Sequence, residues 1–216
     1  IRSFLFAIKY VSLQTQRAPD IFENNLFLGQ FDDFMQSLVS IELLAKQGVR
    51  NTCLRETRYL LEAGIKCCYI EQQEPDYSLE GKIRVFKEEI NDSDIKYINE
   101  IRFPHFGEDI KESFINDAKS YYGLSSKYIH LSQAQIFERI ALVEKGRYIG
   151  FEGTEELKEL NNRLRLCLSY TLVLLFACIP EWIVGDFLVE PNGDMVNWYY
   201  RRSKYINEID KNFDYK

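Results

Sequence analysis

The sequence predicts an all-α protein, a bundle of about seven to nine helices. Apolar residues recur with the 3.6-residue period of a helix along most of the 216 residues, and almost no segment alternates with the two-residue period of a strand. The five prolines and eleven glycines stand between these apolar segments, where they can end helices.

The composition supports one sizeable apolar core. Hydrophobic residues make up 46% of the chain, and a chain of this length buries about 70% of its unfolded surface. No repeat, low-complexity segment or linker divides the sequence. We therefore expect a single helical domain that covers residues 1–216.

Individual helices follow from the apolar stripes and from the residues that begin or end them. Their expected ranges are 1–14, 20–47, 51–73, 79–90, 93–101, 108–122, 132–145, 154–179 and 195–210. Gly48 and Gly123 are expected to end helices, while Ser132, with Gln three residues later, matches the capping box that opens one. Thr154 is expected to cap a helix that is apolar almost all round beyond Leu166, which predicts the central helix of the bundle.

Charge and cysteine usage limit the partners. The net charge of −6 argues against a strongly basic surface for nucleic acid, and no DNA partner is expected. The five cysteines lie in apolar helical stretches without zinc-site spacing, so we expect buried thiols, no metal, no cofactor and a cytoplasmic location. The longest uncharged apolar run, Leu166 to Ile179, is shorter than the roughly 20 residues of a membrane span.

Arg58 interrupts the apolar stripe of its own helix. It follows Leu54 by one turn and precedes Leu61, on the face that the stripe predicts to be buried. An unpaired buried charge is costly, and Glu62 lies one turn further, within reach of Arg58. The pair therefore predicts either a structural ion pair between packed helices or a charged site in a groove, which Arg55 would extend.

A second polar segment precedes the helix expected at 132–145. It runs from Tyr121 to His130 and includes Ser125, Ser126 and one of the two histidines of the chain. Helix N-termini attract anions, and histidine titrates near neutral pH. The segment therefore predicts either a contact site for an anion or a histidine that packs and caps a turn.

Three further features have weaker functional signals. His105, in a loop, is interpreted as a packing or surface residue. Basic residues cluster at Arg163 and Arg165, and again at 201–204 after two tyrosines; such a run either stacks on bases and binds phosphates or forms a solvated helix face. No phosphate-binding glycine loop, zinc-protease motif or serine-hydrolase motif occurs.

Two segments resemble HEPN-type helical domains. Residues 54–63, LRETRYLLEA, are similar to the helix of that superfamily in which Arg is followed, two or three residues later, by Leu-Glu. Residues 124–132, LSSKYIHLS, resemble the Leu-Ser-x-x-x-x-His-x-Ser segment of microbial members. The resemblance implies a HEPN-like core at about 20–180 and a role in microbial defence or a toxin–antitoxin system.

Many HEPN proteins are metal-independent endoribonucleases whose pattern is Arg, four to six residues, then His. The chain departs from this pattern, because no Arg occupies 123–125 before His130 or 98–100 before His105. Ribonuclease activity is therefore not carried over, unless Arg58 supplies the arginine from a neighbouring helix. Enzymatic activity is left open, and a non-catalytic protein is favoured.

Two functions remain. The first is a HEPN-like module that binds RNA or a nucleotide through a groove lined by Arg55, Arg58, Glu62, Ser125, Ser126 and His130. Arg58 would hold phosphate, Glu62 would orient it, and His130 would donate a proton or contact phosphate, so His130 and Arg58 are the catalytic candidates. The second is a non-catalytic interaction or scaffold protein that forms a symmetric homodimer, with Arg58, Glu62 and His130 as a buried network that fixes the packing.

Overall fold

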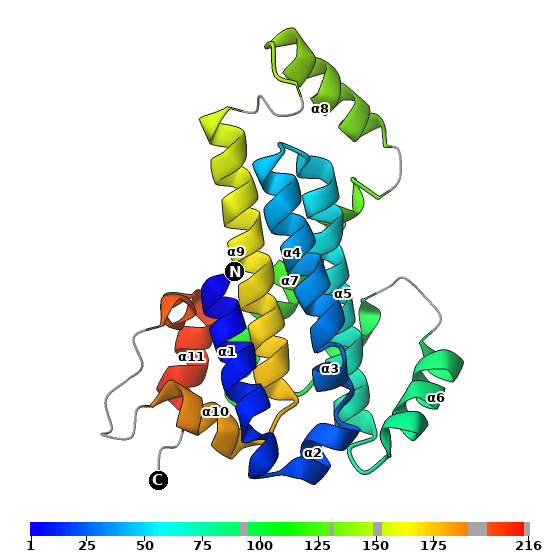
Figure 1. Ribbon diagram of the computed structural model, residues 1–216, viewed down its shortest axis with the longest axis vertical. Helices are drawn as coiled ribbons and strands as arrows, with labels where there is room; N and C mark the ends of the chain where they lie inside the picture. Colours follow the sequence, from blue (N-terminus) through cyan, green and yellow to red (C-terminus); the bar gives the residue numbers. More distant parts are fainter. Residues whose placement is uncertain (91–94, 130–131, 149–152, 190–197, 214–216) are drawn as a thin grey trace.

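The computed structural model describes residues 1–90, 95–129, 132–148, 153–189 and 198–213. Within these ranges the chain forms eleven α-helices, nine of them with at least seven residues, and no strand (Figure 1). This confirms the predicted all-α bundle, and the nine longer helices of the described ranges agree with the predicted seven to nine. None of the helices in the described ranges has the length and apolar character that crossing a membrane requires.

Two long helices form the centre of the bundle, α5 (Arg50–Gln73) and α9 (Thr154–Ala177). Every residue of α9 from Cys167 to Phe176 is buried, as predicted for the central helix. The two helices approach closely at Gly64, where an added Cβ atom would lie 3.3 Å from Leu174 Cδ1. This close approach explains a glycine in the middle of α5, where its conformational freedom otherwise destabilises a helix.

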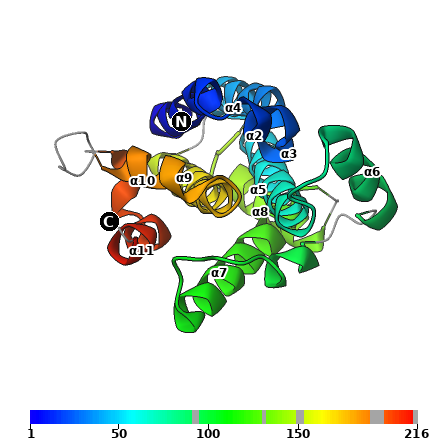
Figure 2. The same ribbon diagram turned by 90° about the horizontal axis from the view of Figure 1, so that it is seen from below.

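The other helices surround this pair. They are α1 (Arg2–Leu13), α4 (Phe31–Lys46), α6 (Leu79–Glu89), α7 (Glu108–Ser126), α8 (Gln133–Glu144), α10 (Glu181–Leu188) and α11 (Lys204–Asn212). Helices α4 and α7 pack on opposite sides of α5, and α1, α10 and α11 lie around α9 (Figure 2). Helix α8 lies across one end of the bundle and buries none of its residues.

The long helix expected at 20–47 is three helices. The structure has α2 (Pro19–Asn24) and α3 (Leu26–Gly29) before α4. Asn25 separates the first two, because its backbone is extended and its side chain accepts a hydrogen bond from the Leu28 N–H. A local side-chain cap therefore replaces the continuous backbone ladder that the apolar period predicts.

Other boundaries follow the sequence more closely. The hydroxyl of Ser132 caps α8 by accepting from the Gln135 N–H at 3.1 Å, as predicted. Helix α7 continues past Gly123 to Ser126, so this glycine does not end it. The N-cap of α9 is the residue before Thr154, and no side chain caps that helix.

Two short segments form 3-10 turns where the sequence predicts α-helix. Within the described residues, the helix expected at 93–101 is a 3-10 turn, η2 (Lys96–Asn99). The helix expected at 195–210 is a 3-10 turn, η3 (Tyr199–Arg202), followed by α11. The extended backbone of Ser203, with ψ of 145°, separates these two elements.

Candidate functional site

The predicted partners of Arg58 lie together between α5 and α7. Arg58 Nη2 is 3.3 Å from Glu62 Oε2, and Arg58 Nε donates to Ser126 Oγ at 3.0 Å. The guanidinium also donates to the Tyr122 hydroxyl and lies 4.4 Å from the centroid of that ring. The side chains of Arg58 and Glu62 are 13% and 16% exposed, so the pair is largely buried.

Glu62 is shared between two cations. Its Oε1 lies 2.7 Å from Lys66 Nζ, and its Oε2 accepts from the Tyr122 hydroxyl at 3.1 Å. Burial and the carboxylate of Glu62 together raise the pKa of Tyr122 to about 12, so the phenol remains a hydrogen-bond donor at neutral pH. We call Arg58, Glu62, Lys66, Tyr122 and Ser126 the Arg58 cluster.

The other residues predicted for this groove lie elsewhere. Arg55 Nε donates to the backbone carbonyl of Tyr128, so it holds the segment after α7. Ser125 is fully buried in the core and does not line an open surface. His130 lies outside the described residues. Of the six predicted residues, the structure therefore brings Arg58, Glu62 and Ser126 into one cluster.

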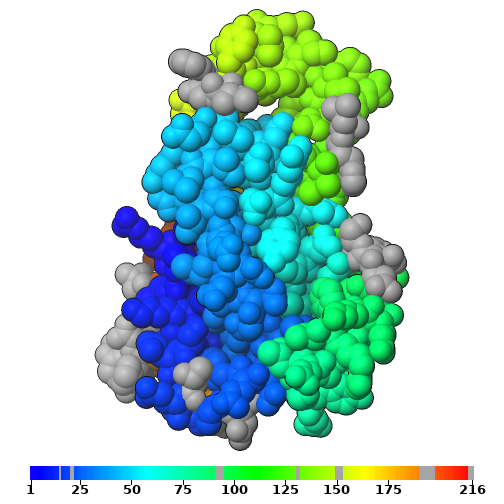
Figure 3. Space-filling model, turned by 45° about the vertical axis from the view of Figure 1, so that its right-hand side comes forward, coloured from blue at the N-terminus to red at the C-terminus, as the bar shows by residue number. Residues whose placement is uncertain are grey.

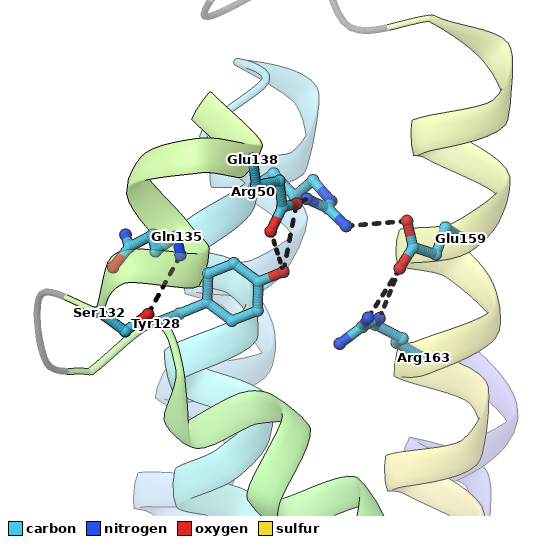
Figure 4. Close-up of polar contacts among 7 residues, drawn as sticks. All are labelled: Arg50, Tyr128, Ser132, Gln135, Glu138, Glu159 and Arg163. Atoms are coloured by element: carbon cyan, nitrogen blue, oxygen red, sulfur yellow. Dashed lines mark hydrogen bonds and ion pairs between the residues drawn. The ribbon is translucent and has the colours of Figure 1, made fainter. Parts of the chain in front are cut away.

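A second ion-pair cluster, which the sequence analysis missed, joins α5, α8 and α9 (Figure 4). Arg50 Nη1 lies 2.5 Å from Glu138 Oε1, and Arg50 Nη2 lies 2.9 Å from Glu159 Oε2. The Tyr128 hydroxyl donates to Glu138 at 2.9 Å, and Arg163 pairs with Glu159 at 2.7 Å. These contacts hold α8 against the bundle mainly through polar groups.

A sequence signal for this second cluster exists. Arg50 is the first residue of α5, and a cation is unfavourable at the positive end of a helix dipole. In the structure its side chain is 8% exposed, so it requires carboxylate partners. Glu138 and Glu159 supply them from two other helices, which the sequence alone does not place beside Arg50.

The other candidate residues, His105 and the five cysteines, lie in surroundings that indicate packing roles. His105 is buried, its ring centroid lies 4.7 Å from that of Phe213, and burial lowers its pKa, which agrees with a packing residue. None of the five cysteines forms a disulfide, and four are buried. Among the described residues, no group of three or more His, Cys, Asp or Glu side chains is arranged to hold a metal ion.

Comparisons with known proteins found no match among protein-family models, curated proteins or solved structures. The HEPN resemblance therefore stays a prediction, carried by residues 54–63 and 124–132.

Proposed function

We propose that the chain is a non-catalytic interaction module that pairs with a second copy of itself through helix α8. The observation that carries this proposal is the apolar outward face of α8. Four large apolar side chains of this helix are 42%, 59%, 48% and 39% exposed: Ile136, Phe137, Ile140 and Val143. Contiguous exposed apolar surface of this kind is typical of interaction sites.

The charged side chains in the middle of α8 point the other way. Glu138 and Arg139 line a hollow between α8 and the turn from α4 to α5, and this hollow is visible beneath α8 in Figure 3. A helix as short as α8 is marginal in water unless tertiary packing covers its apolar face. Within the described chain that face has no cover, so a partner surface would stabilise it.

A second copy of the chain fits this face. The four apolar side chains of the stripe carry no charge, so a partner surface needs no complementary charge opposite them. Two antiparallel copies of α8, related by a two-fold axis near Ile140, would cover each other, and two-fold dimers are the commonest symmetric assembly. Phe137, the most exposed residue of the stripe, is the kind of aromatic anchor that dominates interface energies.

RNA or nucleotide binding at the Arg58 cluster, as the HEPN resemblance implies, is the other function expected from the sequence. A phosphate there would compete with Glu62 for the Arg58 guanidinium, which already contacts Tyr122 and Ser126. These contacts favour the structural role of the cluster, in which it fixes the packing of α7 on α5. The interaction module is therefore the function that the geometry supports best.

The substitution Phe137→Asp tests the pairing. We expect the wild-type chain to have the mass of a dimer by light scattering, and the variant to dissociate about 30-fold more readily, the loss typical of an aromatic hot spot. The matched control is Val39→Asp, an apolar side chain 53% exposed on α4, which should leave the dimer intact. A Phe137→Asp variant with the mass of the wild-type dimer would contradict the proposal, as would a wild-type chain that is monomeric at every concentration.

A further inference from the structure

The structure brings together two basic segments that are distant in the sequence. Arg165 of α9 and Arg202 of η3 line one hollow, and aromatic rings form much of the rest of its wall. The hollow has a volume of about 420 Å³. This size is within the ~300–1,000 Å³ range of sites for small molecules.

These two arginines differ from their basic neighbours in their partners. Each of the neighbours forms an ion pair: Arg163 with Glu159 at 2.7 Å, Arg201 with Asp210 at 3.3 Å and Lys204 with Asp117 at 3.2 Å. Arg165 instead donates to the neutral amide of Asn162 at 2.9 Å. Within the described part of the chain, neither Arg165 nor Arg202 lies within ion-pair distance of a carboxylate.

The aromatic wall combines a fixed floor with one exposed ring. Trp198 and Tyr200 are buried, and the Trp198 indole N–H donates to the Ser3 carbonyl at 2.7 Å. Ser203 is held by a 2.9 Å hydrogen bond between its hydroxyl and that of Ser169. Tyr199, by contrast, is 59% exposed and packs edge-on against Tyr200, so its ring is available to a ligand.

We propose that this hollow, with Arg165, Arg202 and Tyr199, binds a nucleotide. Two guanidinium groups that have no carboxylate partner among the described residues match the negative charge of a phosphate group, and the planar fork of each can donate to two phosphate oxygens. An exposed tyrosine ring offers a platform on which a base stacks. Because the chain as a whole is acidic, the attraction of a phosphate group is confined to the surroundings of these two arginines. The site contains no residue of α8 or of the Arg58 cluster.

Calorimetric titration with AMP tests the site. We expect Arg165→Gln and Arg202→Gln each to weaken AMP binding roughly tenfold or more, because each removes a charged donor to phosphate. Lys204→Gln is the matched control, since it removes the same charge from the same segment, and it should bind AMP like the wild type. Tyr199→Ala should weaken AMP binding and leave the binding of inorganic phosphate unchanged.

Two short RNAs, with and without a 5′ phosphate, distinguish the sources of the ligand. Tighter binding of AMP than of either RNA identifies a free nucleotide, and tighter binding of the 5′-phosphorylated RNA identifies an RNA end. Both results support the site, provided that the two arginine variants reduce them. No AMP binding by the wild type, or equal affinities in Arg165→Gln, Arg202→Gln and Lys204→Gln, would overturn it.

Discussion

Replacing Glu71 with alanine is expected to lower the free energy of unfolding by about 3–5 kcal/mol, the cost of leaving a buried partner charge unpaired. Lys82 Nζ lies 2.8 Å from Glu71 Oε2, and the two side chains are 2% and 7% exposed. Glu71 Oε1 also accepts the Leu26 N–H at 2.5 Å, at the start of α3. One carboxylate thus connects α3, α5 and α6. Its loss leaves the Leu26 N–H without this acceptor and leaves the Lys82 ammonium with the neutral Asn24 carbonyl, 2.8 Å away, in place of a charged partner.

Urea denaturation measures this loss. The matched control is Glu88→Ala, which removes an exposed carboxylate from α6 and should change stability by no more than about 0.5 kcal/mol. Replacing both members of the pair, Glu71→Met with Lys82→Met, should recover part of the loss, because no unpaired charge then stays buried. A Glu71→Ala protein as stable as the Glu88→Ala protein would contradict this interpretation of the pair.

Arg58→Ala has the second largest expected effect, a loss of about 2–3 kcal/mol, because it removes charged hydrogen bonds and a cation–π contact from a largely buried site. Glu62 would retain Lys66 and the Tyr122 hydroxyl, which limits the loss. Arg58→Lys should restore only part of the stability, since an ammonium cannot reproduce the forked contacts with Ser126 and Tyr122.

The same variant separates the two functions expected from the sequence. If the Arg58 cluster fixes helix packing, Arg58→Ala lowers the urea midpoint and leaves RNA and nucleotide affinities at their wild-type values. If Arg58 instead holds phosphate, the variant loses RNA or nucleotide binding and its stability changes little. The second result would favour the HEPN-like interpretation of this cluster.

The sequence predicts those features that depend on neighbours along the chain. Arg58 and Glu62 are one helical turn apart, so their ion pair follows from spacing alone. The Ser132 cap follows for the same reason. Asn25, which breaks the helix expected at 20–47, also acts locally: Asn is a favoured N-cap residue, but the apolar period that continues past it predicts one unbroken helix.

Features that join distant segments could not be predicted in this way. Arg50 meets Glu138 and Glu159 only because α8 and α9 come to the N-terminal end of α5. Likewise, the clusters containing Arg165 and Arg202 are separate in the sequence, and only the packing of η3 near α9 places them in one hollow. The tertiary structure decides which side chains these arginines meet. Neither the apolar period nor the spacing of residues along the sequence indicates it.

Oxidative cross-linking of Ile140→Cys tests most directly whether the outward faces of two α8 helices meet. A disulfide requires the two Cα atoms to lie within about 7 Å, a condition that an antiparallel pair centred at Ile140 meets. The native thiols compete little, since four of the five are buried and burial raises the pKa of Cys167 to about 12. We predict a covalent dimer that forms much faster than with Val39→Cys; equal, slow cross-linking of both variants would contradict pairing through α8.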